Sequence, residues 1–496
     1  MKKIYINQDN HQFYLHPAED MTEAGCRALV DYYAEPETVK GILFCTNVQR
    51  ALYDSNVWER FSNIDDDNIL MTNLKLLSRH KVDQFAVWLQ RCRELNLEGW
   101  LTMRMNDCHG LGEVVQGKIG SDCYKWPTEM WLAHPELRRA PYRSERSWEG
   151  AFNYMLKNVR DHHLALAEEI LNRWDMYGLE LDWMRWGMMV PPGSETEALS
   201  VLTTVVRQIR CYADKAEKRV GHKILLAHRV PSNIETCLDA GYDVITWARE
   251  GLADMITFSS FGDIDFSCQT RLWRALLGEK TVMNLCPEFA TVKSYPGGVA
   301  YAYDFLTGSI ASSEGFDNFT LFNDCYQELY VHEEFLTYLR RLGNPGVYEM
   351  PRRIPFACSA NYPGSNRRAA LPMPLRQPCE GTDFARMEQN ISLRFPYGGK
   401  AANAFLLAGF SAETDRQTVE SMTARMNTVL LNRTECPEIR EHELKHPMGR
   451  CLPEDVSFLQ AWKIPDGVLH PGNNVAEFLP EPVDGSIVWA EITLLP

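Results

Sequence analysis

The stretch that decides the fold runs from Tyr177 to Trp186 and reads Y-G-L-E-L-D-W-M-R-W. Successive side chains of a strand point to opposite faces, so Glu180 and Asp182 face one way and the apolar residues between them face the other way. A helical pattern at 153–174 precedes the stretch, and a loop with two prolines follows it. A strand that ends in acids just before a loop is where a (β/α)8 barrel carries its chemistry.

Strand and helix patterns alternate on both sides of this stretch. Apolar runs predict strands at 3–6, 39–45, 98–103, 178–182, 223–227, 255–258, 281–286 and 318–322. The spacing of apolar residues predicts helices at 22–33, 81–95, 153–174, 195–218, 243–250, 268–277, 299–312 and 327–341. Eight such units in about 340 residues favour a closed (β/α)8 TIM barrel of the α/β class over an open doubly wound sheet. The first strand lacks the glycine-rich turn of a dinucleotide fold.

The pattern changes after about residue 344, where a proline-rich linker begins. Short alternating runs follow at 389–395, 402–407, 428–431, 474–478 and 486–494, and they predict a small β-sandwich. The sequence therefore predicts two domains, a catalytic barrel over residues 1–345 and a jelly-roll-like accessory sandwich over residues 346–496.

The composition of the chain restricts the classes of binding partner and the cellular compartment that we expect. The chain has 496 residues and a formal net charge of -15, which argues against nucleic acid and anionic membranes as partners. We find no apolar run of signal-peptide or membrane-span length, and the 14 cysteines lack paired spacing, so we expect a cytoplasmic protein with reduced thiols. Aromatic residues in the long segment after the third strand are candidates for a subunit interface, so a homo-oligomer is an open alternative. The length of that segment predicts a functional loop or lid.

Carboxylates follow two predicted strands on opposite sides of the barrel mouth. Asp182 ends the fourth strand and Glu288 follows the seventh. Glycoside hydrolysis needs such a pair, one acid for the leaving oxygen and one carboxylate that attacks carbon or activates water. We therefore expect Asp182 and Glu288 to be catalytic. Glu180, two residues deeper on the same face, supports an arginine in an ion pair or takes the place of Asp182 as acid/base.

Further polar residues at or just past strand ends are candidates for binding a sugar. Together with Glu180 they are Asn47, Arg104, Asn106, His109, Arg185, Arg229 and Asn323. An arginine can orient a carboxylate or bind an acidic substituent, and amide groups suit sugar hydroxyls. The competing roles are structural ion pairs and loop caps.

Metal binding is the competing use of the acids. Glu180, Asp182, His228, Glu288 and Asp324 resemble the ligand set of a metal-dependent sugar isomerase barrel. The sequence has no local metal motif and no G-x-S-x-G nucleophile motif, so we expect neither a metal nor another cofactor. A non-hydrolytic sugar enzyme, isomerase or lyase, and a carbohydrate-binding barrel without turnover remain the alternatives.

The segment from Gly178 to Trp186 resembles the Gly-(Ile/Leu)-(Glu/His)-(Leu/Phe)-Asp-aromatic-(Ile/Met)-Arg strand of family-10-like glycosyl hydrolases, a group of bacterial barrel proteins. The segments 100–107 and 246–254 are also similar to such proteins, and 462–478 is similar to sandwich domains attached to glycosidases. The resemblance covers roughly residues 1–342. It implies a (β/α)8 hydrolase, and the wider barrel-glycosidase pattern implies an acid/base at Asp182 and a nucleophile at Glu288.

These observations together predict a glycoside hydrolase that cleaves the O-glycosidic bonds of oligosaccharides or small glycosides. In this prediction Asp182 is the general acid/base, and Glu288 is the nucleophile or base.

Overall fold

The computed structural model describes most of the barrel and the larger strands that follow it. The described residues are 3–66, 68–118, 125–259, 268–286, 315–322, 336–337, 339–340, 342, 352–355, 371, 373–375, 391–397, 403–437, 456–470, 472–479 and 484–495. Glu288, Asn323 and Asp324 lie outside them, as do the helix predicted at 299–312 and most of the one predicted at 327–341.

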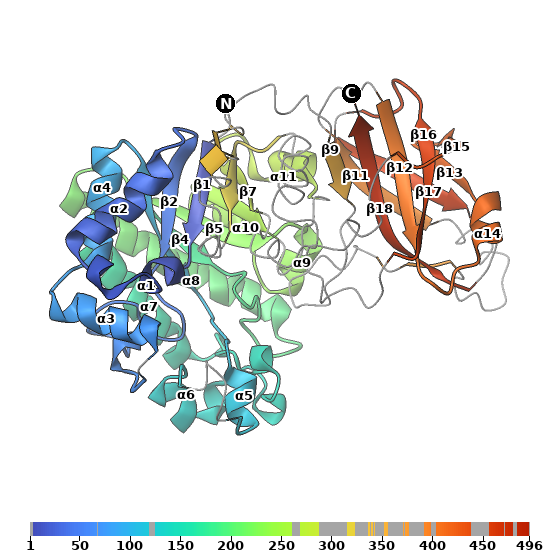
Figure 1. Cartoon of the computed structure of the whole chain (residues 1–496). Helices are drawn as coiled ribbons and strands as arrows, with labels where there is room; N and C mark the ends of the chain where they lie inside the picture. Colours follow the sequence, from blue (N-terminus) through green and yellow to red (C-terminus); the bar gives the residue numbers. More distant parts are fainter. Residues whose placement is uncertain are drawn as a thin grey trace.

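Eight parallel strands close into a barrel in chain order (Figure 1). They are β1 (Lys3–Gln8), β2 (Val39–Cys45), β3 (Glu98–Arg104), β4 (Gly178–Asp182), β5 (Leu225–Pro231), β6 (Met255–Ser259), β7 (Val282–Cys286) and β8 (Asn318–Leu321). The predicted (β/α)8 barrel is thus confirmed, and every predicted barrel strand overlaps an observed one.

The predicted end of β5 at Ala227 is wrong, because the strand continues through two polar residues. Arg229 faces the inside of the barrel, where it pairs with Asp182. His228 faces the helices, where the Trp183 indole donates a hydrogen bond to it. Both polar side chains therefore have partners within the strand, and polarity alone did not mark its end.

The barrel helices follow the predicted alternation. The helices of this part are α1 (His11–Tyr14), α2 (Glu23–Ala34), α3 (Ile69–Arg79), α4 (Gln84–Glu94), α5 (Leu111–Val115), α6 (Glu129–Ala133), α7 (Lys157–Arg173), α8 (Glu195–Val220), α9 (Ile234–Asp239), α10 (Val244–Arg249) and α11 (Thr270–Leu277). The side chain of Thr22 caps α2 by accepting a hydrogen bond from the backbone N–H of Gly25. Five of these helices, α1, α3, α5, α6 and α9, lie outside the helices predicted from the sequence. None of the described helices is long and apolar enough to cross a membrane.

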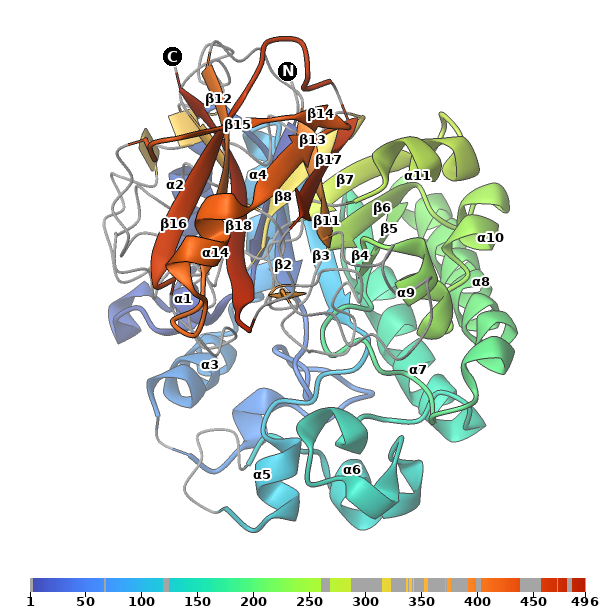
Figure 2. The same ribbon diagram turned by 90° about the vertical axis from the view of Figure 1, so that its right-hand side faces the viewer.

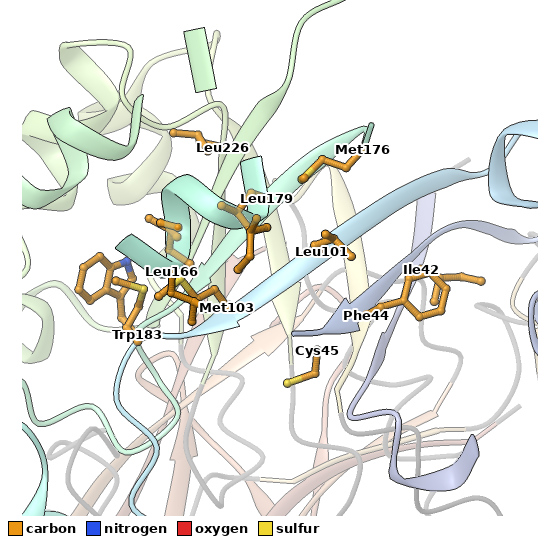
Figure 3. Packing of buried hydrophobic residues seen from close by; sticks show 14 of the residues in the cluster. Ile42, Phe44, Cys45, Leu101, Met103, Leu166, Met176, Leu179, Trp183 and Leu226 are labelled. Atoms are coloured by element: carbon orange, nitrogen blue, oxygen red, sulfur yellow. The ribbon is translucent and has the colours of Figure 1, made fainter. Parts of the chain in front are cut away.

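The alternation of β4 sets both the core and the site. Leu179, Leu181 and Trp183 are buried in the main hydrophobic core, outside the strand ring. Figure 3 shows Leu179 and Trp183 close to Leu166 of α7. Each fully buried side chain of this kind contributes roughly 1.5–3 kcal/mol to stability. This packing leaves the two carboxylates of the strand on the inner face of the barrel.

Gly178, the first residue of β4, is required by the packing inside the barrel. A Cβ atom at this position would lie 2.2 Å from Cζ3 of Trp100 and 2.7 Å from the carbonyl oxygen of Leu225. We expect Gly178→Ala to lower the free energy of unfolding by about 2–3 kcal/mol, measured by urea denaturation. Gly187→Ala is the matched control, since its Cβ would come no closer than 3.5 Å to a neighbour. Equal losses in the two variants would contradict this account.

The C-terminal strands form two antiparallel sheets (right in Figure 1). One has the order β10-β18-β12-β16-β15 with β9 beside β18, and the other has the order β11-β17-β13-β14. The elements are β9 (Arg352–Pro355), β10 (Met373–Pro374), β11 (Ile391–Tyr397), β12 (Asn403–Phe410), α14 (Arg416–Ser421), β13 (Thr423–Met426), β14 (Val429–Leu430), β15 (Asn432–Thr434), β16 (Phe458–Ile464), β17 (Gly472–Leu479) and β18 (Ser486–Leu495). Leu406 and Trp462 of the first sheet share a core with Met426 and Phe478 of the second, as expected for a β-sandwich. The predicted boundary at residue 345 falls outside the described residues and stays a prediction.

Candidate active site

The connection between β3 and α7 is the long segment that the sequence predicted as a functional loop. It contains α5 and α6, which Figures 1 and 2 show below the barrel. Cys108, Leu111, Trp131 and Ala151 form a small core of its own. Because β3 ends where this segment begins, the segment lies at the carboxyl ends of the barrel strands, the face on which barrel enzymes carry their active sites.

Asp182 ends β4, and its carboxylate acts only as a hydrogen-bond acceptor in its contacts with described residues. Oδ1 accepts from the backbone N–H groups of Met184 (3.0 Å) and Arg185 (3.1 Å). Nη1 of Arg229 donates to both oxygens, at 3.0 and 3.2 Å. Arg229 also donates to Oγ of Ser259, and its side chain is fully buried. The carboxylate is therefore held in one orientation at the end of the strand.

Glu180 lies one layer deeper inside the barrel and is buried. The hydroxyl of Thr102 donates to its Oε1 at 3.1 Å, whereas no described residue is in hydrogen-bond geometry with Oε2. Burial raises the pKa of Glu180 to about 7, and the nearby carboxylate of Asp182 also raises it, against the opposing effects of Arg229 and the neighbouring threonines. The ion pair expected of Glu180 is formed by Asp182 instead. Glu180 is thus a carboxyl group that keeps a proton up to about neutral pH.

This raised pKa predicts a pH-dependent effect of Glu180→Gln. The folded protein holds the proton more tightly than the unfolded chain, so ionisation of Glu180 destabilises the fold as the pH rises from about 4.5 to about 7. We expect the variant to gain up to about 3 kcal/mol over wild type at pH 8 and little at pH 4.5, measured by urea denaturation at both values. Glu279→Gln, at an exposed position, is the control and should change neither. A difference independent of pH would contradict the assigned cause.

Arg104, the last residue of β3, bridges two buried carboxylates. Its Nη2 donates to Oδ1 of Asp9, just after β1, and its Nη1 donates to Oδ2 of Asp107 at 2.7 Å. Arg185 pairs with the other oxygen of Asp9 at 3.2 Å. Asp9 and Asp107 are missing from the predicted site residues. Their only signal in the sequence is that each follows a strand.

The charges of this cluster cancel. Among the described residues it has three guanidinium groups and three paired carboxylates, namely Arg104, Arg185, Arg229, Asp9, Asp107 and Asp182, with the carboxyl group of Glu180 beside them. All six side chains are less than a tenth exposed. Each arginine therefore has a carboxylate partner inside the protein, and none of the three needs an acidic ligand to balance its charge.

His109 is the partly exposed titratable group of this network. Its Nδ1 lies 2.8 Å from Oδ1 and 3.0 Å from Oδ2 of Asp107, and its side chain is 28% exposed. Burial opposes ionisation of Asp107, but His109 and Arg104 outweigh it and hold the pKa of that carboxyl well below its ordinary value. Because the ionised Asp107 can only accept, Nδ1 of His109 carries the proton of this hydrogen bond, and Nε2 is the ring nitrogen left outside the contact.

The two predicted asparagines hold the loops around this cluster. Asn47 donates to the carbonyl oxygens of Val48 and Arg104 and accepts from the backbone N–H of Arg104. Asn106 donates to the carbonyl oxygens of Phe152 and Met188 and accepts from the N–H of Phe152. Both amides are thus engaged with backbone, which is the loop-capping arrangement.

The residues considered for a metal are not gathered in the described part of the chain. His228 accepts a hydrogen bond from Trp183 at Nδ1, and its Nε2 is bonded to the carbonyl oxygen of Leu252. Burial lowers the pKa of His228 to about 4. Among the described residues, no group of three or more His, Cys, Asp or Glu side chains could hold an ion. Glu288 and Asp324 lie outside these residues.

No protein-family model and no curated protein matches the chain. Similar solved structures include α-L-fucosidase isoenzyme 2 from Paenibacillus thiaminolyticus, with a TM-score of 0.41 and 9% identity over 72% of this chain and 51% of that chain. The glycoside hydrolase domain of PgaB (BpsB) from Bordetella bronchiseptica has a TM-score of 0.40 and 7% identity over 69% of this chain and 98% of that chain. A family 18 N-acetylglucosaminidase from Paenibacillus barengoltzii has a TM-score of 0.31 and 10% identity over 58% and 68%. The chain spans about half the length of the fucosidase. These neighbours are glycoside hydrolases, but such scores and identities assign neither a substrate nor a reaction to this chain.

Proposed function

We propose that this protein is a glycoside hydrolase that cleaves O-glycosidic bonds of oligosaccharides or small glycosides with two carboxylates, Asp182 and Glu288. The observation that carries the proposal is the contact set of Asp182. This carboxylate is oriented by Arg229 and two backbone N–H groups at the carboxyl end of β4, on the catalytic face of a closed barrel. Glu288 follows the end of β7 by two positions, and β7 is three strands away around the ring.

The contacts of Asp182 also suggest how the two roles are divided. All four of its hydrogen bonds use it as an acceptor. This arrangement suits a nucleophile or base better than a proton donor, so the proposal assigns the acid role to Glu288, the reverse of the expectation from sequence. Glu180, which keeps its proton up to about pH 7, is the second candidate for the acid.

A neutral sugar fits the charge balance better than an acidic one. Arg104, Arg185 and Arg229 are each paired with a carboxylate of the protein. A uronate would have to compete with these carboxylates in a poorly hydrated environment, which is unfavourable for a buried charge. In this proposal the three arginines position the catalytic groups, and His109, which is bonded to Asp107 of the cluster, meets the substrate.

A panel of aryl α- and β-glycosides tests the proposal. The panel contains neutral sugars and uronides and is run with and without chelator on the full chain. We expect hydrolysis of at least one neutral glycoside, unchanged by chelator, with kcat/KM for the matching uronide lower by about tenfold or more. Absence of turnover for every glycoside would overturn the proposal. Chelator-sensitive interconversion of free sugars would then favour an isomerase, and sugar binding without a product would favour a binding barrel.

A further inference from the structure

A partly exposed histidine lies between two tryptophans beside the charge cluster, and the two-carboxylate chemistry does not use it. The ring of His109 is 5.3 Å from that of Trp186 and 5.8 Å from that of Trp126, between ring centroids. Both tryptophans are partly exposed. Trp186 comes from the loop after β4 and Trp126 from the segment between α5 and α6. Distant parts of the chain thus bring three rings together at the carboxyl ends of β3 and β4.

Hydrogen bonds to Asp107 orient the imidazole of His109. Asp107 accepts from both the ring Nδ1 and the backbone N–H of His109, and the side chain of Gln49 donates to the carbonyl oxygen of His109. Arg104 in turn fixes Asp107. Nε2 makes no hydrogen bond to a described residue. The chain therefore orients the ring through Nδ1 and leaves the second ring nitrogen, Nε2, for a ligand.

The backbone of Trp186 is a second, independent sign of function. Its φ is +66°, in the left-handed region, which is unfavourable for a residue with a bulky side chain. The preceding Arg185 is pinned, because its N–H donates to Asp182 and its guanidinium pairs with Asp9. Backbone strain of this kind persists where the surroundings impose it, and it concentrates at binding and catalytic sites.

We infer that His109, Trp126 and Trp186 form a sugar-binding subsite, in which the tryptophans contact the C–H face of a neutral sugar ring and Nε2 of His109 forms a hydrogen bond with one of its hydroxyls. An indole buries apolar C–H surface, and a polar group beside it fixes the orientation of the ligand. The neutral charge balance behind the subsite favours an uncharged ring. This inference rests on the proposed function and names the residues that hold its substrate.

Binding is measured apart from turnover. Neutral monosaccharides (glucose, galactose, fucose and N-acetylglucosamine), with glucuronate as the charged comparison, are titrated into the full chain and followed by ligand-observed NMR. We expect at least one neutral sugar to bind, and His109→Ala and Trp186→Ala to weaken its Kd by about tenfold or more. Trp186→Phe, which keeps an aromatic face, should recover most of the affinity. Tyr142→Ala removes an exposed aromatic ring of the same segment and should leave Kd unchanged.

Hydrolysis and unfolding separate the subsite from a structural role. On the best aryl glycoside, Trp186→Ala should raise KM by about tenfold with a smaller change in kcat. Glycine adopts the left-handed backbone of position 186 without the strain that alanine has there. The unfolding temperature of Trp186→Gly should therefore exceed that of Trp186→Ala, while both variants bind the sugar equally weakly. Failure of all the neutral sugars to bind, or a Kd unchanged within twofold in both alanine variants, would overturn the inference. Sugar binding that depends on His109, without any hydrolysis, would support the subsite and overturn the proposed hydrolase activity. Hydrolysis with a KM that is unchanged in the variants would support the hydrolase activity and overturn the subsite.

Discussion

Asp182→Asn is expected to lower kcat for the best glycoside by about three to five orders of magnitude. The substitution keeps the shape of the side chain but removes the negative charge that attacks carbon or activates water. It also removes the buried ion pair between Asp182 and Arg229, which costs about 3 kcal/mol of stability. Activity and folding must therefore be measured together. Urea denaturation gives the stability of the variant, and steady-state kinetics are measured under conditions in which it is folded.

Asp254→Asn is the matched control for this experiment. Asp254 precedes β6 at the opposite end of the barrel, where it pairs with Arg210 and Lys223. The control also breaks ion pairs, which are less buried than that of Asp182, but it should keep kcat within about twofold of wild type. A comparable loss of kcat in both variants would show that stability, rather than chemistry, explains the effect of Asp182→Asn.

Arg104→Met is expected to cost the largest amount of stability, about 3–5 kcal/mol of unfolding free energy. The methionine fills much of the space but removes the guanidinium that pairs with the buried Asp107 and with Asp9. Arg104 helps to hold the pKa of Asp107 below its ordinary value, so the carboxylate stabilises wild type above that ordinary value and loses its contribution as the pH falls. The deficit of the variant should therefore shrink in acid.

Arg91→Met tests whether burial is the cause. Arg91 also contacts two carboxylates, those of Asp31 and Glu94, but it lies at the surface. We expect a much smaller loss there than in Arg104→Met, since exposed ion pairs contribute little. Urea denaturation of the two variants side by side is the measurement. Similar losses of unfolding free energy in the two variants would show that burial is not the reason why the ion pairs of Arg104 matter.

The barrel and the position of Asp182 could be predicted because both follow local rules. The two-residue period of β4 separates its carboxylates from Leu179 and Leu181, whatever the rest of the chain does. The pairing of charges could not be predicted, because Arg104 and Asp9 are 95 positions apart and meet only when β1, β2 and β3 assemble side by side. Strand pairing also hid the true end of β5, since the buried Arg229 is stable inside the strand only beside Asp182, its partner on β4.

The conformation of Trp186 had no signal in the sequence either. Left-handed backbone is normally marked by glycine or asparagine, and here it is imposed by the contacts of the preceding Arg185. Asp9 and Asp107 were overlooked for a related reason. A polar residue after a strand is common, and only the packed barrel distinguishes the ones that hold an arginine in place.

The most direct test of the two-carboxylate claim is kcat/KM of wild type, Asp182→Asn, Glu288→Gln and the double variant on the same glycoside. The account predicts that each single variant loses about a thousandfold or more. Because the two groups act in one reaction, the double variant should be no slower than the slower single variant. A folded Glu288→Gln variant within tenfold of wild type would contradict the account and leave Asp182 without the partner that we assign to it.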